Sequence, residues 1–259
     1  CRHGLLVLLR QCLRAVQHQQ RQRRPLRRLT AALLAAVLAL SIALPVFASD
    51  DGDTIYINSV SDLISLAKSC AYDQWSVGKT VVLQKDLSLE GMLWEPIPSF
   101  SGQFKGNGHT ISDLTITGEY SPAGLFGIVE EKGSIESLSV RGVVSVSDSA
   151  DTTTGGIVGI NHGTLINCQF TGVVTGDSEV GGIVGRNESE GTIDHSTARA
   201  IVTGKSSTGG IAGYNLGAIT GCTAVQSGGG VACLLGKVTV NDCAVYDNTA
   251  AKSADDVYN

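Results

Sequence analysis

The chain has 259 residues, of which 17% are charged, and its formal net charge at pH 7 is −5. That value averages two unlike parts, because residues 1–48 hold eight of the 19 basic residues and none of the 24 acidic ones. Residues 49–259 therefore carry 11 basic and 24 acidic residues, a net charge of −13. Such an acidic body repels phosphate backbones, which argues against nucleic acid as a partner.

Residues 1–48 have the pattern of a secretory leader, with the signal peptide itself at about 22–48. A basic run at 23–28 precedes an apolar run at 31–46, and the small residue Ala48 follows where a signal peptidase would cut. The apolar run is slightly short for a membrane-spanning helix, so an uncleaved anchor is the less favoured alternative. We therefore predict cleavage after Ala48 and a secreted or cell-surface protein.

Residues 49–90 are predicted to form an N-terminal capping segment. Runs rich in β-branched and aliphatic residues favour short strands at 54–58, 80–84 and 86–89. Ser59 opens a predicted helix that ends at about Cys70, and the spacing of Ser59 and Asp62 resembles a capping box. The residues expected on its apolar face are Leu63, Leu66 and Ala67. A helix here would cover the open end of a stack of strands.

An internal repeat occupies residues 91–245. The sequence Gly-Gly-Ile-Val-Gly-x-Asn, with Ala once in place of Val, occurs three times, each time followed by a glycine and an aliphatic residue. The repeated residues are Gly155, Gly156, Gly159 and Asn161; Gly181, Gly182, Gly185 and Asn187; and Gly209, Gly210, Gly213 and Asn215. With degenerate copies at 123–127 and 229–232, successive copies lie 20 to 32 residues apart.

This region does not suit a helix, because a glycine interrupts it every few positions and costs a helix about 1 kcal/mol each time. Short strands separated by glycine turns, and repeated at this interval, are typical of a chain that coils into a solenoid. Stacked coils pair as parallel strands and share one narrow apolar interior. The sequence therefore predicts an all-β fold, a parallel β-helix over 91–245 that ends in a polar tail at 246–259.

Each repeated position has an expected role in such a coil. The glycine pair would permit positive φ and a close approach of successive coils. The three asparagines would stack at a turn, where their amides can form a ladder and where Asn tolerates the left-handed backbone region. Cys168, Ser196, Cys222 and Cys243 would occupy one small inward-facing column.

The cysteines outside the leader do not form a convincing disulfide set. Five remain there, namely Cys70, Cys168, Cys222, Cys233 and Cys243. That number is odd and no Cys-x-x-Cys pair occurs, which argues against both a complete disulfide framework and a zinc cage. Buried thiols are therefore favoured. Cys222 and Cys243 could bond to each other, but a ladder of thiols is the preferred interpretation.

The repeat and the Gly-Thr-Leu/Ile, Cys or Ser, and Val-x-Gly that follow it resemble the GLUG motif. The stretch at 94–114, which includes Gly-Asn-Gly-His, resembles the segment that commonly precedes GLUG arrays, so the resemblance covers about residues 80–245. It implies a right-handed parallel β-helix and an extracellular, often adhesin-like, setting in large bacterial surface proteins. The last repeat departs from the pattern, because it is shortened and lacks the asparagine.

A carbohydrate-active enzyme on the same coil, a polysaccharide lyase or hydrolase, is the alternative function. Glycoside hydrolysis needs two carboxylates about 5–9.5 Å apart, and stacked coils place equivalent residues about 4.8 Å apart. The residues that follow the repeated asparagines are, in turn, His162, Glu188 with Glu190, and Leu216. Asp194 is expected to face Asn167 and Gly221 in the neighbouring repeats. Because no carboxylate recurs in register, we predict no catalytic residue.

The histidines and acidic runs are also assigned structural roles. His109 would begin a strand just after a tight Asn107-Gly108 turn, and His162 and His195 lack a second His at ligand spacing. The two acidic runs, at 50–53 and 148–151, fit no calcium-loop spacing. The sequence therefore predicts no metal and no cofactor.

Taken together, these patterns favour a non-enzymatic scaffold or adhesion module that is secreted or held at the cell surface. Its expected partner is an unidentified extracellular ligand, either a host or bacterial surface protein or a glycan. Further domains of a longer chain are a second kind of expected partner. The sequence does not identify the ligand or the mode of attachment.

Overall fold

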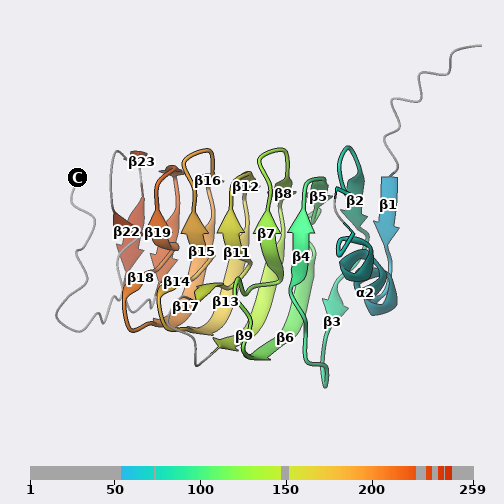
Figure 1. The fold of residues 1–259 in the computed structure, drawn as a ribbon, viewed down its shortest axis with the longest axis horizontal. Helices are drawn as coiled ribbons and strands as arrows, with labels where there is room; N and C mark the ends of the chain where they lie inside the picture. Colours follow the sequence, from blue (N-terminus) through green and yellow to red (C-terminus); the bar gives the residue numbers. More distant parts are fainter. Residues whose placement is uncertain are drawn as a thin grey trace, which may run out of the picture. The chain divides into compact units, whose positions relative to one another are not determined.

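The computed structural model describes residues 54–72, 74–146, 152–225, 232–234, 239–241 and 243–246. They belong to one compact unit, Asp51–Asn259. Within it the chain winds into stacked coils, and each strand pairs in parallel with the equivalent strands of the coils before and after it (Figure 1). The structure confirms the predicted parallel β-helix with one short helix near its N-terminus. The leader and residues 247–259 of the tail lie outside the described residues.

Four sheets run along the stack of coils. The eight-stranded sheet contains β1 (Thr54–Ile57), β2 (Thr80–Leu83), β5 (Gln103–Lys105), β8 (Ser134–Glu136), β12 (Thr164–Ile166), β16 (Thr192–Asp194), β20 (Ala218–Thr220) and β23 (Thr239–Asn241). The six-stranded sheet contains β4 (Ile97–Phe100), β7 (Phe126–Val129), β11 (Val158–Asn161), β15 (Val184–Asn187), β19 (Ala212–Asn215) and β22 (Ala232–Leu234).

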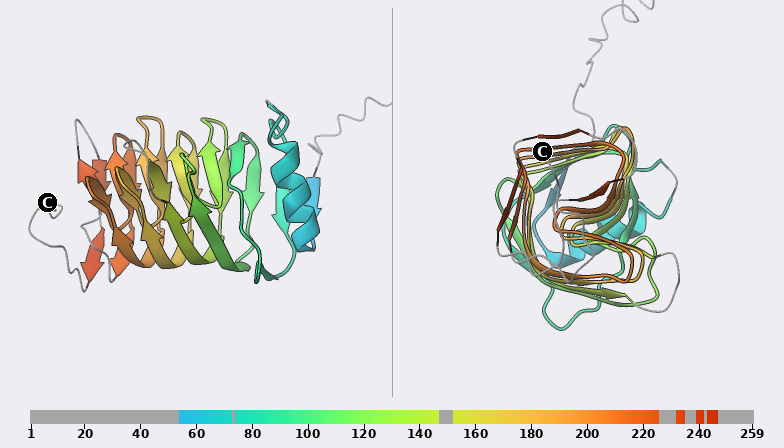
Figure 2. Two further views of the ribbon diagram at one scale, coloured as in Figure 1. Left: turned by 60° about the horizontal axis from the view of Figure 1, so that its bottom comes forward. Right: turned by 90° about the vertical axis from the view of Figure 1, so that its left-hand side faces the viewer.

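The other two sheets complete the coils. The seven-stranded sheet contains β3 (Leu87–Ser88), β6 (Thr110–Gly118), β9 (Ser139–Val146), β13 (Gln169–Thr175), β17 (Thr197–Thr203), β21 (Thr223–Val225) and β24 (Ala244–Tyr246). The three-stranded sheet contains β10 (Thr153–Gly155), β14 (Glu179–Gly181) and β18 (Ser207–Gly209). One full coil passes through all four sheets, as in the succession β10, β11, β12 and β13 (Figure 2).

The register of the strands stacks equivalent repeat positions on one another. Asn161 at the end of β11 pairs with Asn187 of β15, which in turn pairs with Asn215 of β19. Strands β1 and β2 of the capping segment join the same eight-stranded sheet as the repeats. A repeat of 26 or 28 residues therefore returns each residue type to the same place on every coil.

The interior of the coils is apolar because inward-facing and outward-facing residues alternate along each strand. In β13, Phe170 and Val174 are buried whereas Thr171 and Val173 are partly exposed. The early coils hold a cluster of three aromatic rings with centroids 5.4–6.3 Å apart, formed by Phe100, Phe104 and Phe126. Trp94 is also buried and donates from Nε1 to the Leu125 carbonyl at 3.1 Å, so it packs into the first coils.

The predicted helix is confirmed as α2 (Val60–Ser69), with Ser59 as N-cap and Cys70 as C-cap. The Ser59 hydroxyl accepts a hydrogen bond from the Asp62 amide at 3.2 Å. The Asp62 carboxylate accepts one from the Asn58 amide at 2.9 Å, which makes the reciprocal bond of a capping box one residue further back. Leu63 and Leu66 are buried, so the helix closes the N-terminal side of the apolar interior.

Candidate functional site

The repeated asparagines meet at one corner of the coil, between the six-stranded and eight-stranded sheets. Asn161, Asn187 and Asn215 define this amide corner, and all three side chains are fully buried. The Asn161 Nδ2 donates to Asn187 Oδ1 at 2.8 Å, and the Asn187 Nδ2 donates to Asn215 Oδ1 at 2.7 Å. The amides therefore form the ladder that the repeat predicts.

The remaining groups of the amide corner bond to the backbone of the turn that follows. Asn161 Nδ2 donates to the Gly163 carbonyl at 3.2 Å, and Asn161 Oδ1 accepts from the Gly163 amide at 3.1 Å. Asn215 makes the same pair of bonds with Gly217. Asn187 donates to the Gly191 carbonyl at 3.1 Å. These amides hold the corner together and have no group directed toward a ligand.

The third glycine of each repeat lies where the three-stranded sheet packs against the six-stranded sheet. A Cβ atom at Gly185 would lie 2.6 Å from the Thr154 backbone nitrogen and 2.8 Å from the Gly159 carbonyl oxygen. A Cβ atom at Gly155 would lie 2.7 Å from the Ile183 carbonyl oxygen of the next coil, so the close approach expected of the glycine pair is present. The expectation of positive φ at the Gly-Gly pair is wrong, because Gly155 and Gly181 are not among the residues with positive φ.

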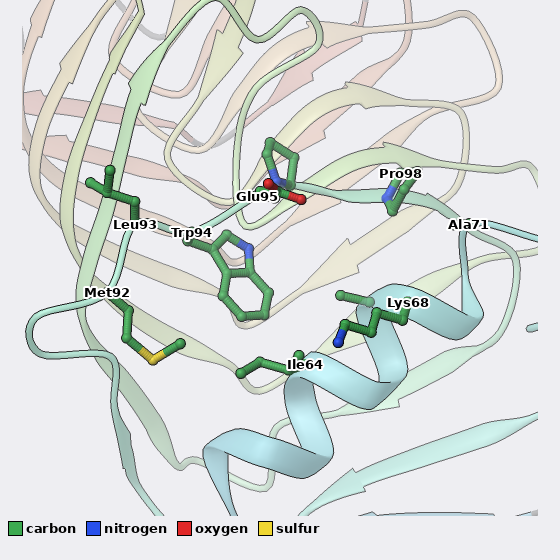
Figure 3. Close-up of a pocket in the computed structure, with 10 residues that line it drawn as sticks. Ile64, Lys68, Ala71, Met92, Leu93, Trp94, Glu95 and Pro98 are labelled. Carbon is green, nitrogen blue, oxygen red and sulfur yellow. The ribbon is translucent and has the colours of Figure 1, made fainter.

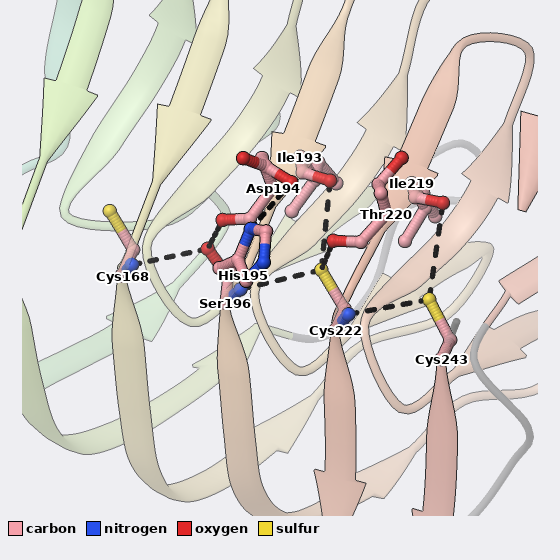
Figure 4. A network of polar contacts seen from close by, with 9 residues as sticks. All are labelled: Cys168, Ile193, Asp194, His195, Ser196, Ile219, Thr220, Cys222 and Cys243. Atoms are coloured by element: carbon pink, nitrogen blue, oxygen red, sulfur yellow. Dashed lines mark hydrogen bonds and ion pairs between the residues drawn. The ribbon is translucent and has the colours of Figure 1, made fainter. Parts of the chain in front are cut away.

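A second column lies at the next corner, between the eight-stranded and seven-stranded sheets (Figure 4). Cys168, Ser196, Cys222 and Cys243 define this thiol corner. The Cys168 amide donates to Ser196 Oγ at 3.1 Å, and the Ser196 amide donates to Cys222 Sγ at 3.4 Å. The Cys222 amide donates to Cys243 Sγ, also at 3.4 Å. The column is a ladder of thiols and one hydroxyl, and its three cysteines are not disulfide-bonded.

The buried thiols of the chain are held in their neutral form. Burial raises the pKa of the Cys168 thiol to about 12 and that of the Cys70 thiol to about 11. The hydrogen bond with Cys243, and then burial, raise the pKa of the Cys222 thiol above its ordinary value. Because the thiolate is the nucleophile and metal-binding form, these cysteines are structural groups.

Left-handed backbone residues recur at the thiol corner of successive coils, and the three repeated asparagines are not among the residues with positive φ. Ser137, Asn167 and His195 have φ of 52°, 52° and 46°, and Gly221 has φ of 60°. Each lies two residues before the next strand of the seven-stranded sheet. The repeated asparagines were expected to adopt this conformation, and that expectation is wrong because they end extended strands.

The sequence Asp194-His195-Ser196 contains the three residue types of a hydrolase triad, but the backbone separates their side chains. His195 Nδ1 lies 2.8 Å from Asp194 Oδ1 on the surface. Ser196 is fully buried and its hydroxyl donates inward to the Asp194 carbonyl at 3.1 Å. A nucleophile must reach substrate, so this run does not form a catalytic site.

Asp194 pairs with Ile166 and Thr220, which corrects the expectation that it faces Asn167 and Gly221. That expectation misaligned the repeats by one residue.

The outer side of the amide corner gathers acidic residues that the sequence analysis only partly recognised. Glu130, His162 and Glu188 occupy equivalent positions on three successive coils, because each directly follows a strand of the six-stranded sheet. Glu130 accepts a hydrogen bond from Ser99 Oγ at 2.7 Å, and Glu188 pairs with Arg186 at 2.9 Å. Glu130 was missed because its repeat is degenerate, with Val129 at the position of the asparagine.

A polar hollow of about 470 Å³ opens beside this row of side chains. Its lining includes Ser99, Glu130, Glu131, Lys132 and His162. Within the described ranges, no three or more His, Cys, Asp or Glu side chains are arranged to hold a metal ion. The acidic runs at 50–53 and 148–151 lie outside those ranges. The hollow therefore offers carboxylates and one imidazole for hydrogen bonding, without a metal cluster.

An apolar hollow of about 320 Å³ lies between α2 and the segment that leads into β4 (Figure 3). Ile64, Met92 and Trp94 contribute apolar surface to it, and Lys68 and Glu95 add charged groups. The neighbouring Leu93 is 71% exposed. This hollow belongs to the cap of the solenoid.

His109 has the structural place that the sequence predicts. Asn107 and Gly108, with φ of 52° and 78°, form the turn before it, and β6 begins at the next residue. Its Nδ1 lies 3.2 Å from Asp86 Oδ1, and the same carboxylate accepts from the Thr110 amide at 2.9 Å. These bonds lower the pKa of the Asp86 carboxyl, and the bond from the Thr110 amide has the larger effect. The cluster fixes a turn on the surface.

Comparison with known families identifies the repeat. The family model described as the GLUG motif matches residues 176–203. This segment is one coil of the structure, from the start of the turn before β14 to the end of β17. The chain is a GLUG-repeat β-solenoid. The motif match covers the second of the three clear repeats, the one that contains the central asparagine of the amide corner.

Two curated relatives share part of the GLUG-repeat solenoid. Halomucin of Haloquadratum walsbyi is 37% identical over 155 residues, which is 55% of this chain and 2% of halomucin. A glycine-rich protein of Evansella cellulosilytica, provisionally named a membrane protein, is 30% identical over 137 residues, or 38% of this chain and 16% of that protein. The chain therefore spans only a small part of either relative.

A solved structure shares the fold of the GLUG-repeat solenoid. It is a Bacteroides ovatus protein provisionally assigned as an immunoglobulin A1 protease, with a TM-score of 0.58 and 17% sequence identity. The match covers 78% of this chain and 79% of the other. Identity this low supports a common fold alone. Among the residues with described coordinates, no helix is both long and apolar enough to cross a membrane.

Proposed function

We propose that the GLUG-repeat solenoid is a non-enzymatic scaffold or adhesion module of a secreted or cell-surface protein. One observation carries the proposal: the polar side chains that the repeat conserves from coil to coil are turned inward and bonded to one another. Asn161, Asn187 and Asn215 are fully buried, and Ser196 is as well. The repeat therefore builds a rigid stack, and the side chains available to a partner are the outward-facing ones that vary between coils.

The relatives support a surface setting for this module. Halomucin and the protein provisionally named a membrane protein both contain regions similar to this chain. In each of them the similar region is a small share of a much longer protein, which is what a spacer or ligand-presenting module requires. The predicted signal peptide, with cleavage after Ala48, agrees with export.

A second candidate function is a carbohydrate-active enzyme. The observation that favours it is the row of Glu130, His162 and Glu188 on successive coils, of which Glu130 and His162 line a polar hollow. Two coils separate the glutamates, about 9.5 Å along the stack, which is at the upper end of the range for inverting glycosidases. Against it, both carboxylates are engaged by neighbours, Ser99 and Arg186.

One experiment tests the two candidates against each other. The purified chain is incubated with acidic and neutral polysaccharides, and new reducing ends and unsaturated uronates are measured. We expect no cleavage above the blank and retention of the chain on one or more of the polymers. Cleavage that is lost in Glu130→Gln or Glu188→Gln would overturn the scaffold proposal in favour of the enzyme. Protease treatment of intact cells, which should digest the chain, tests its surface location.

A further inference from the structure

After a polar column of Ser139, Gln169 and Thr197, the outer face of the seven-stranded sheet carries three further ordered columns of side chains on β9, β13 and β17. These strands are in register over their whole common length, so that every outward residue of one strand stacks on its equivalents in the others. The long strands of this sheet lie side by side along the stack (Figure 2). Their outward side chains form what we call the β9–β13–β17 face.

The first of the three further columns is basic. Arg141 and Arg199 both pair with Thr171, which lies on the strand between them. Both arginines are exposed, and neither makes an ion pair with any carboxylate in the part of the chain that the structure describes. Two strand spacings separate them, about 9.5 Å. Two guanidinium groups are thus presented at a fixed interval along the stack.

The other two columns are apolar and hydroxylic. Val143, Val173 and Ile201 form the middle column, in which Val143 is 40% and Ile201 is 59% exposed. Ser145, Thr175 and Thr203 form the third column. A molecule lying along the stack would meet the two cations beside the polar column, then an apolar strip, and then hydroxyl groups on the far edge.

The charge of this face is opposite to that of the rest of the body. None of the three strands contains an acidic residue, although residues 49–259 have a net charge of −13. Outside these strands, Asp86 is close enough to Arg141 for the arginine to contribute to the lowering of the Asp86 pKa. The acidic residue of the turn after β13, Asp177, is neutralised by Lys205 at 2.8 Å. Glu130 and Glu188 lie at the amide corner, and Glu136 and Glu179 lie on the eight-stranded and three-stranded sheets. At physiological salt, charges separated by more than about 8 Å are largely screened, so the local positive charge determines what the face attracts.

We propose that the β9–β13–β17 face binds an acidic polysaccharide whose chain lies along the stack and carries a carboxylate on alternate sugars. Each arginine would take one carboxylate by paired N–H···O bonds. Their interval of two strand spacings is comparable with the length of a disaccharide unit. The apolar column would contact the C–H faces of the sugar ring between them, and the hydroxyl column would bond to sugar hydroxyls. This inference rests on the proposed function and specifies its ligand.

Binding to hyaluronan, which carries a carboxylate on every second sugar, tests the proposal. The purified chain is titrated with hyaluronan oligosaccharides by calorimetry, and with the same oligosaccharides after reduction of their carboxyl groups. We expect binding of the charged form only, weakening as NaCl rises from low to high concentration. Arg141→Gln and Arg199→Gln should each weaken it about five-fold, and Ile201→Glu, which places a negative charge in the apolar column, at least as much.

Arg186→Gln is the matched control. Arg186 carries the same charge and lies on β15, in the same coil as Arg199, but it pairs with Glu179 and Glu188 and stacks on the Tyr214 ring at 4.8 Å. Arg186→Gln changes the net charge by the same amount as Arg141→Gln or Arg199→Gln. Because Arg186 lies outside the β9–β13–β17 face, its substitution should change hyaluronan binding by less than about two-fold. Circular dichroism of each variant confirms that the fold is retained.

The possible results separate the inference from the proposed function. Equal binding by the double variant Arg141→Gln/Arg199→Gln, or equal binding of carboxyl-reduced hyaluronan, would overturn the inference. The inference would also be overturned if the chain did not bind hyaluronan, or if it bound only to anionic lipid vesicles. A third contrary result would be self-association of the chain that Ile201→Glu abolishes. Cleavage of hyaluronan by the chain would overturn the proposed function; loss of binding in the arginine variants would still support the face as the binding site.

Discussion

The two inner corners of the solenoid stack one residue per coil, but they use different chemistry. At the amide corner, each asparagine donates to the next at 2.7–2.8 Å and also bonds to the turn that follows it. At the thiol corner, backbone amides donate to a hydroxyl at 3.1 Å or to sulfur atoms at 3.4 Å. The amide corner is a chain of side-chain bonds that links successive coils. The thiol corner is a set of separate, weaker bonds between a backbone amide and a small side chain.

This difference indicates which repeated residues can be exchanged for another residue type and which cannot. An amide in a ladder must both donate and accept, so no other residue of its shape can replace it. A thiol or a hydroxyl at the other corner accepts one bond from a backbone amide and donates one to a backbone carbonyl. Either group can do both in the same small space, and the structure already shows both at that corner. The repeated asparagine is therefore a specific requirement, whereas the Cys or Ser position tolerates exchange.

The largest expected effect is at the centre of the amide corner. Asn187→Ala would remove the acceptor of Asn161 Nδ2 and the donor to Asn215 Oδ1, so each of these buried groups would keep only its bond to the turn that follows it. We expect the free energy of unfolding in urea to fall by about 2–4 kcal/mol, since each lost hydrogen bond costs about 0.5–1.5 kcal/mol and the cavity adds to this. Asn58→Ala, at an exposed asparagine before α2, is the control and should change it by less than about 0.5 kcal/mol. A loss below about 1 kcal/mol in Asn187→Ala would show that the ladder is not a requirement.

The next effect concerns alkaline pH and the thiol corner. The pKa of Cys168 is raised to about 12 in the fold, so its thiol stabilises the folded state below the ordinary thiol pKa and this contribution is lost as the pH rises toward 12. By pH 10.5 the loss should reach about 2 kcal/mol relative to pH 8. Cys168→Ala should show a smaller decline in urea stability over the same range, although it is less stable than the parent at pH 8. Identical pH profiles for the two proteins would contradict the buried neutral thiol.

A smaller effect is expected from exchange within the thiol corner. Ser196→Ala leaves the Cys168 amide without its acceptor and should lower the free energy of unfolding by about 1–2 kcal/mol. Ser196→Cys restores an acceptor of the kind that Cys222 supplies to the next coil, and it should recover most of that loss. Urea unfolding of the two variants measures the difference. If Ser196→Cys were as damaging as Ser196→Ala, the corner would be as specific as the amide ladder.

The sequence predicted the stack of coils because the repeat interval alone returns Gly and Asn to the same place on each coil. It also predicted α2, whose boundaries follow from Ser59 and the spacing of Leu63 and Leu66. The position of the left-handed residues could not be obtained in this way. The left-handed positions were assigned to the wrong corner, because an asparagine occurs at both corners and only the backbone distinguishes Asn161 from Asn167.

The surface of the coils was the part least accessible from the sequence. Glu130 escaped notice because the coil before the first clear repeat has no asparagine to mark the position. The placement of Arg141 and Arg199 on either side of Thr171 depends on the register of β9, β13 and β17, and the middle strand breaks the column of arginines. The repeat therefore predicts what the inside of the coil must conserve, and only the strand pairing shows which outward residues stand together.

The smallest expected effect comes from exchanging His and Asn at the left-handed backbone positions of the thiol corner. It tests whether the backbone is strained at these positions. His195 has φ of 46°, a region that costs most non-glycine residues about 1–2 kcal/mol but that Asn adopts more readily. Asn167 occupies the equivalent place one coil earlier, with φ of 52°. His195→Asn should therefore raise the free energy of unfolding by about 0.5 kcal/mol, and Asn167→His should lower it by a similar amount. The measurements are made in high salt, which screens the ion pair between His195 and Asp194. Opposite signs for the two exchanges would assign the effect to the backbone; a loss of stability in both would assign it to the side-chain contacts of each residue.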